Sequence, residues 1–256
     1  MKYRNRFSHE FYRKFATPIF YFIAIFAISL IFCGCPADLK IIANPDKSFS
    51  LEFNSPIGEN FVSALEYLSQ IPEQFSENSQ NIASPGQNQS QNFDLSQIID
   101  TKEIENEMNL RYFSQSQVKI QKKSAKSYDF IANSKIKNIA KFPKECMSQE
   151  KLPDGKNRVT FSLGPEILQA TLLRDETTLK GFAEILMAPL ITGEKMSAEE
   201  YRDLLAAVFG ETVTDDLLSG EFKVDFVCPD RTILSQKIPM ADLLIANENV
   251  QFIFTY

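Results

Sequence analysis

The chain has 256 residues, 44% of them apolar, and a formal net charge of −6, so it is long and apolar enough for one domain or two small ones. Its only histidine is His9, which excludes zinc sites of the HExxH type because these need two imidazoles. No GxGxxG or GxxxxGK[ST] pattern occurs, so phosphate-cradling loops are unsupported.

The N-terminal segment has the three-part pattern of a secretory signal. Five basic residues and one acidic residue precede an uncharged run, Pro18–Cys33, of 16 residues. As a helix this run is about 24 Å long, shorter than the ~30 Å hydrocarbon core of a bilayer. The small residue Gly34 and then Cys35 follow it, and Pro36 ends the apolar pattern.

This Gly34–Cys35 pair resembles the lipobox of bacterial lipoproteins. The resemblance implies cleavage of a signal peptide spanning residues 1–34 and acylation of Cys35, which would then anchor the protein to a membrane of the cell envelope, on its periplasmic or surface face. Phe32 stands where Leu is usual, a looser pattern similar to that of spirochaete lipoproteins. Cys33 is a weaker candidate for acylation, because bulky Phe32 would then precede the cut. We favour the lipoprotein over an uncleaved transmembrane helix and over a plain secretory signal.

Cleavage changes the chemistry available to the mature chain, residues 35–256. It removes five of 27 basic and one of 33 acidic side chains, leaving 22 and 32 and a net charge of −10. It also removes His9, so no imidazole remains as general base or metal ligand. We therefore expect no enzyme activity, no catalytic residue, no metal and no cofactor. Nucleic-acid binding conflicts with export and with the negative charge.

Cys146 and Cys228 remain beside the acylated Cys35. No histidine is present to activate either thiol as a nucleophile. Sequence alone does not bring the two sulfurs within bonding reach, and we favour free thiols over a disulfide. Cys228 shares a strand face with Phe222, Val224 and Phe226, so we expect its side chain to point into the core.

The mature chain begins with a predicted β-hairpin. Residues 39–43 and 49–53 alternate or run apolar, and Asn44–Lys47 has the composition of a turn. A helix is predicted over residues 59–69 from its apolar period. Segment 70–97 follows, in which sixteen of 28 residues are Gln, Asn or Ser. Such a composition buries little apolar surface, so we interpret it as a flexible insertion.

A capped helix is predicted from Asp100 to Tyr112, followed by paired strands near 118–120 and 128–130. Residues 117–144 hold eight Lys and one Asp, a local charge of +7. One interpretation is a basic contact patch facing anionic headgroups or an acidic partner, made of Lys119, Lys122, Lys123 and Lys126. The alternative, which we favour, is the solvated face of a hairpin.

The remaining elements are predicted from capping and periodicity. They are a loop over 143–155, a strand over 158–163, helical segments from Gly164 and over 179–190, a helix from Ser197 that stops at Gly210, a short turn opening at Thr214, and strands over 222–228, 233–238 and 250–256. Asp215 and Asp216 are interpreted as residues at a helix start, where acids suit the helix dipole. We expect the last strand to pair on both edges.

These elements predict a single α+β domain: an antiparallel sheet of about six strands with helices packed on one face, built from ββα and αββ blocks. Residues 186–210 resemble a stretch of uncharacterised spirochaete lipoproteins, a resemblance that implies no activity. The predicted function is a lipid-anchored, non-enzymatic cell-envelope protein that binds a partner or maintains envelope structure. The alternative is a carrier or sensor of an apolar ligand held between sheet and helices.

Overall fold

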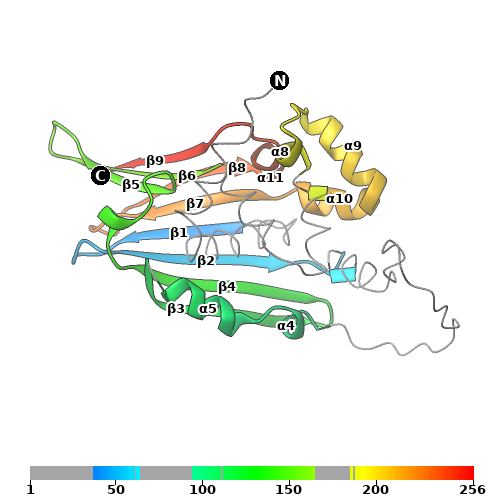
Figure 1. Ribbon diagram of the computed structural model, residues 1–256, viewed down its shortest axis with the longest axis horizontal. Helices are drawn as coiled ribbons and strands as arrows, with labels where there is room; N and C mark the ends of the chain where they lie inside the picture. Colours follow the sequence, from blue (N-terminus) through cyan, green and yellow to red (C-terminus); the bar gives the residue numbers. More distant parts are fainter. Residues whose placement is uncertain (1–36, 61, 64–93, 111, 165–184, 187) are drawn as a thin grey trace, which may run out of the picture.

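A computed structural model describes the part of the chain that carries the sheets (Figure 1), namely residues 37–60, 62–63, 94–110, 112–164, 185–186 and 188–256. The signal segment, Gly34 and Cys35 lie outside the described residues. So do most of the predicted helix over 59–69, most of the insertion over 70–97, and residues 165–184.

Within the described residues, six strands form one sheet in the order β3-β4-β2-β1-β7-β8. The α+β class is therefore confirmed. The strands are β1 (Ala37–Ala43), β2 (Phe49–Ile57), β3 (Phe113–Ser124), β4 (Ser127–Ile136), β7 (Glu221–Val227) and β8 (Ile233–Pro239).

The β1–β2 hairpin forms where the alternation predicted it. Ala37, Leu39 and Ile41 are buried on one face of β1, as the period of two requires. In the turn, the Asn44 side-chain amide donates to the Ser48 hydroxyl at 3.0 Å, and Lys47 takes a positive φ of 63°. The predicted pairing of 118–120 with 128–130 is also confirmed, although β3 and β4 run well beyond those residues.

The prediction of a purely antiparallel sheet is wrong. Strand β1 pairs with β2 antiparallel on one edge and with β7 parallel on the other, with Asp38 beside Lys223 and Ile41 beside Phe226. A parallel pair needs a crossover connection rather than a hairpin, and here residues 44–220 make that connection. β1 is thereby an interior strand with both edges hydrogen-bonded.

Three further described strands form a second sheet, in the order β5-β6-β9: β5 (Met147–Lys151), β6 (Asn157–Leu163) and β9 (Val250–Thr255). Residues 143–155 are thus not simply a loop, because they contain β5. Short polar strands such as Met147–Lys151 lack the apolar alternation that sequence reasoning relies on.

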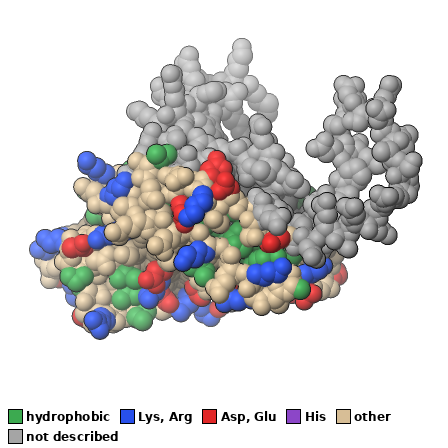
Figure 2. Space-filling view, turned by 90° about the horizontal axis from the view of Figure 1, so that it is seen from below, with side chains coloured by type: hydrophobic (Ala, Val, Ile, Leu, Met, Phe, Trp, Pro, Cys, Tyr) green, Lys and Arg blue, Asp and Glu red, His purple; other side chains and the backbone are tan. Residues whose placement is uncertain are grey.

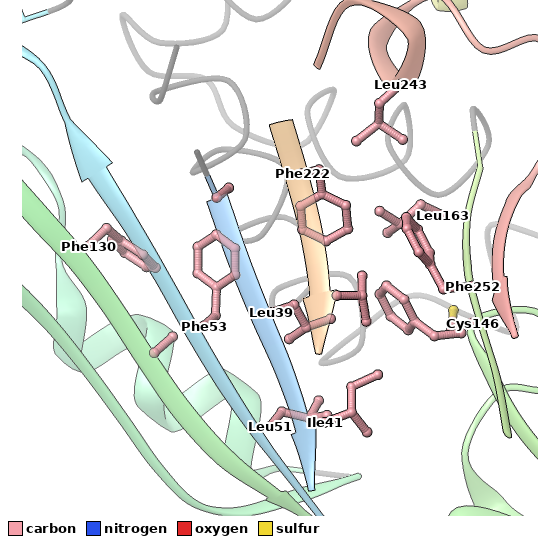
Figure 3. Packing of buried hydrophobic residues seen from close by; sticks show 14 of the residues in the cluster. Leu39, Ile41, Leu51, Phe53, Phe130, Cys146, Leu163, Phe222, Leu243 and Phe252 are labelled. Carbon is pink, nitrogen blue, oxygen red and sulfur yellow. The ribbon is translucent and has the colours of Figure 1, made fainter. Parts of the chain in front are cut away.

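The second sheet packs against β7 through aromatic side chains. Phe226 stacks on Phe254 with ring centroids 5.3 Å apart, and Phe222 meets Phe252 edge-on at 5.5 Å. Figure 3 shows Phe222 and Phe252 pointing toward one another between the two sheets, with Cys146 beside them. Offset and edge-to-face contacts are the geometries that aromatic rings prefer.

The last strand does not pair on both edges, contrary to the prediction, because β9 is an outer strand of the second sheet. Its open edge is covered by a side chain of β8. The amide of Gln236 accepts from the N–H of Ile253 at 3.2 Å and donates to its carbonyl at 2.8 Å. The glutamine amide therefore takes the place of a neighbouring strand and joins the two sheets.

The described helices are α4 (Leu95–Ile98), α5 (Thr101–Asn109), α8 (Ala188–Thr192), α9 (Ala198–Phe209), α10 (Glu211–Leu218) and α11 (Met240–Leu244), with the 3-10 helix η1 (Ile139–Lys141). The predicted capping box of α9 is confirmed by reciprocal bonds between Ser197 and Glu200. Gly210 ends α9 with a φ of 81°, as expected. That all helices pack on one face stays a prediction.

Asp215 and Asp216 do not stand at a helix start, because α10 begins at Glu211. Asp215 instead accepts from the Arg202 guanidinium at 2.8 Å, which ties α10 to α9, and Asp216 accepts from the Asn60 side chain. The capping interpretation of this acid pair is therefore wrong.

Side chains of α5 cover the outer edge of β3. The N–H of Val118 donates to the Glu105 carboxylate at 2.9 Å, and the N–H of Ser116 donates to the Asn109 side chain at 3.1 Å. Unpaired backbone groups on an edge strand invite pairing with another chain, so these bonds protect the edge. The ammonium of Lys102 and the N–H of Val118, both bonded to the carboxylate, lower the pKa of Glu105.

We predict that Glu105→Gln removes about 1 kcal/mol of unfolding free energy at pH 7, because a hydrogen bond to a charged acceptor is replaced by one to a neutral acceptor. The pKa of Glu105 is lower in the folded than in the unfolded chain, so this stabilisation is complete above the unfolded value and is lost as pH falls through the folded value. Urea unfolding of both proteins across acidic pH measures it.

Glu194→Gln, at an exposed carboxylate between α8 and α9, is the matched control. If Glu105→Gln loses no more unfolding free energy than the control, or if its loss persists unchanged below the folded pKa of Glu105, the carboxylate does not stabilise the edge of β3 as proposed.

Candidate functional site

The residue predicted to carry the acyl chains is joined almost directly to the interior of the large sheet. Cys35 and Gly34 themselves lie outside the described residues, but β1 begins at Ala37, with only Pro36 between. The three residue steps from Cys35 to Asp38 span at most about 11 Å, even fully extended. We call the end of the six-stranded sheet at which β1 begins the anchor end.

Strand register fixes what else lies at the anchor end. One row across the sheet is formed by four residues in register, Asp38, Asn54, Ile131 and Lys119. Three residues further toward the anchor end, another row is formed by Ile57, Tyr128 and Lys122. The second row lies about 10 Å beyond the first, at ~3.4 Å per residue.

The turn between β3 and β4 lies at or beyond this second row. We call Lys122, Lys123 and Lys126, which flank or occupy it, the lysine turn. A fully extended chain from Asp38 brings Cys35 only to about the level of Lys122. The lysine turn therefore reaches at least as far toward the anchor end as Cys35 can. In Figure 1 it is the green turn at the right-hand end of β4.

The four predicted patch lysines do not share one face. Lys119 and Lys123 follow the outward period of β3, and Lys123 pairs with Asp129 at 2.8 Å. Lys122 lies over the Tyr128 ring at 5.7 Å, and Lys126 donates to the Ser63 hydroxyl at 3.2 Å. Lys119 is level with Asp38, away from the turn. Only the other three come together, around the turn.

The surroundings of β3 are mixed in charge. Figure 2, seen from the side of the molecule on which β3 lies in Figure 1, shows basic and acidic side chains interspersed. This agrees with a largely solvated hairpin face. The anchor end also includes helices α9 and α10, which precede β7 and carry six carboxylates against the single guanidinium of Arg202. Among the described residues, the anchor end thus carries the lysine turn beside β3 and an excess of carboxylates beside β7.

The thiols are packing groups in this structure. Cys146 and Cys228 are both free, and Cys228 is buried, as expected from the sequence. Cys146 is buried as well, which the sequence did not predict. Burial is the main cause that raises the pKa of the Cys146 thiol, to about 12. A protonated thiol is a poor nucleophile, because the thiolate is the reactive form. Tyr201 is likewise buried, its phenol donates to the Leu186 carbonyl, and burial raises its pKa.

The inner face of the large sheet carries the aromatic residues considered for an apolar ligand. Phe53 and Phe130 meet with ring centroids 6.2 Å apart, and Phe49 lies 6.5 Å from Phe226. Figure 3 shows Phe53, Leu39 and Leu51 along the same face. These side chains are buried against protein atoms. A ligand held between sheet and helices stays a prediction.

Across the described residues, no group of three His, Cys, Asp or Glu side chains is placed to hold a metal ion. The helices in this part of the chain are all too short or too polar to cross a bilayer. Comparison of the chain with protein-family models, with curated proteins and with solved structures gives no match.

Sequence reasoning missed three polar contacts that shape the molecule. They are the Gln236 clamp on Ile253, the Arg202 link between α9 and α10, and a charged pair on the outer face of the sheet, where Lys223 contacts Asp225 at 2.8 Å. The charges of Lys223 and Asp225 also act on the carboxyl group of Asp38, but burial is the main cause that raises its pKa. The first two contacts join residues that only the topology brings together, whereas Lys223 and Asp225 lie two residues apart on β7.

We predict that the mature protein, unreduced, shows two thiols that react with a disulfide reagent after unfolding and almost none before it, because both sulfurs are buried and the pKa of Cys146 is high. Titration with and without denaturant measures this. Absence of reactive thiols after unfolding would reveal a disulfide, and rapid reaction in the folded protein would show that the sulfurs are exposed.

Proposed function

We propose that this is a lipid-anchored, non-enzymatic protein of the bacterial cell envelope, held to a membrane by acyl chains on Cys35, whose folded body binds a partner or maintains envelope structure. The observation that carries the proposal is the start of β1 at Ala37, two residues after Cys35. An anchor at that position is attached to an interior strand, so the folded body lies against the membrane without a stalk.

Two further observations support the proposal. The basic flank, the short apolar run and the Gly34–Cys35 pair resemble a lipoprotein signal, and Ala37, two residues after Cys35, already belongs to β1. The buried thiols and the buried Tyr201 phenol are committed to packing and hydrogen bonding, which favours a binding or structural role over a catalytic one.

We predict that Cys35→Ser leaves the protein unprocessed or released from the membrane. Stable anchoring needs two acyl chains, at about 0.8 kcal/mol for each buried methylene group, and only the Cys35 sulfur and the new N-terminus would carry them. The measurement is detergent phase partitioning together with the intact mass of the protein from a bacterial host that processes lipoproteins.

The neighbouring variant Cys33→Ser is the matched control, because it removes a sulfur two residues away and leaves Gly34–Cys35 unchanged. It should mature and partition as the wild type does. If Cys35→Ser also matures and partitions with detergent, or if only Cys33→Ser loses its acyl mass, the proposed anchor is wrong.

A further inference from the structure

We propose that the lysine turn, Lys122, Lys123 and Lys126, is a second membrane contact that binds the anionic headgroups of the bilayer in which the acyl chains are held. This inference rests on the proposed anchor at Cys35 and adds to it a site, a ligand chemistry and an orientation. The sequence alone favoured an ordinary solvated hairpin. The register of the sheet adds that these lysines lie at the level that Cys35 can reach.

The short chain between Cys35 and β1 limits how far the anchor can lie from the sheet. The length of the chain keeps Cys35 within about 11 Å of Asp38. Lys122 lies three residues further toward the anchor end than the level of Asp38, which is about 10 Å. The turn residues continue past Lys122. A bilayer surface that holds acyl chains at Cys35 is therefore met by the lysine turn, unless the molecule tilts that edge away.

The anchor and the lysine turn are also separated across the sheet. Strands β1 and β3 are separated by β2 and β4, which is three strand spacings, or about 14 Å at ~4.8 Å each. The acyl chains and the lysine turn thus touch the surface at two separate points. Two separated contacts restrict the tilt of the body along the line that joins them, which a single anchor on one strand does not.

The two sides of the anchor end differ in charge. Around the turn, the described residues include three ammonium groups and two nearby carboxylates: Asp129 pairs with Lys123, and Asp94 interacts with the charge of Lys122. Clusters of lysine close to a membrane surface are attracted by anionic lipids within a Debye length. Helices α9 and α10, with six carboxylates and one guanidinium, lie on the other side of β1 at the same end. An anionic surface attracts the first side and repels the second, so it tilts the molecule with β3 toward the membrane.

The lysines can reach headgroups from where they lie. Lys122 and Lys123 are exposed, and Ala125 at the tip of the turn is exposed as well. The Lys123–Asp129 pair is partly open to water, with about half of the lysine side chain accessible. Exposed ion pairs contribute little stability, so exchanging that partner for a lipid phosphate costs little.

The test uses the full chain, matured in a bacterial host and reconstituted in vesicles of phosphatidylcholine with or without phosphatidylglycerol. A nitroxide is attached at Ala125→Cys in the turn or at Pro45→Cys in the β1–β2 turn, which lies at the opposite end of β1. The buried Cys146 and Cys228 and an acylated Cys35 do not take the label. Accessibility of the label to oxygen and to a water-soluble nickel chelate reports its depth.

We expect the label at position 125 to lose accessibility to the nickel chelate in vesicles that contain phosphatidylglycerol, while the label at position 45 stays accessible. Lys122→Gln with Lys123→Gln should restore accessibility at position 125. Lys151→Gln with Lys156→Gln, the same change of charge on the far β5–β6 hairpin, should not. High salt should act like the first pair of substitutions.

A label at position 125 that stays as accessible as the label at position 45 overturns the inference. The inference is also overturned if the label at position 125 is protected equally with and without phosphatidylglycerol and the lysine substitutions do not change that protection. The turn would then lie on the surface without binding anionic headgroups. Protection by an acidic protein but not by phosphatidylglycerol vesicles assigns the turn to a protein partner instead. The intact mass, taken before reconstitution, reports the anchor separately: a chain without acyl groups overturns the proposed function and this inference with it.

Discussion

The parallel pairing of β1 with β7 is the constraint on which the rest of the structure depends. It places Ala37–Ala43 in the interior of the large sheet, between β2 and β7. Strand β7 in turn presents Phe222 and Phe226 to Phe252 and Phe254 of the second sheet. Without this pair, the β1–β2–β4–β3 part and the part that contains β7, β8 and the second sheet would lose the backbone ladder between them. Burial of aromatic surface stabilises the contact between β7 and the second sheet. The side-chain amide of Gln236 also bonds β8 to the outer edge of β9.

An anchor joined to such a strand has a mechanical consequence. In the proposed lipoprotein, a pull on Cys35 acts on a strand bonded along both edges rather than on a loose tail. On this proposal, chain reach sets the surface that faces the membrane, with the basic β3–β4 turn on one side of β1 and the acidic helices α9 and α10 on the other. On the same proposal, the far end, with the β1–β2 turn and the β5–β6 hairpin, faces away from the membrane.

Local signals in the sequence predicted elements well and topology poorly. Alternation predicted the strand from Phe222 to Cys228, and the Ser197–Glu200 capping box predicted the start of α9. Local periodicity does not indicate which distant strands pair, so the parallel β1–β7 ladder and the separate second sheet were missed. Strand β5 was missed because its residues are polar, and Asp215 was misassigned because its partner, Arg202, lies on another helix. The four patch lysines were found by charge alone, but register separates Lys119 from the other three.

The central claim is that the strand next to the proposed anchor belongs to the interior of the fold, and native-state hydrogen exchange of the mature protein tests it most directly. Strands in a core exchange only through global unfolding, whereas a tether exchanges by local opening. The account predicts that the amides of Leu39 and Ile41 exchange with the same free energy as those of Val224 and Phe226 in β7, and that this value equals the free energy of global unfolding. Exchange of the β1 amides by fraying, while β7 stays protected, would contradict it.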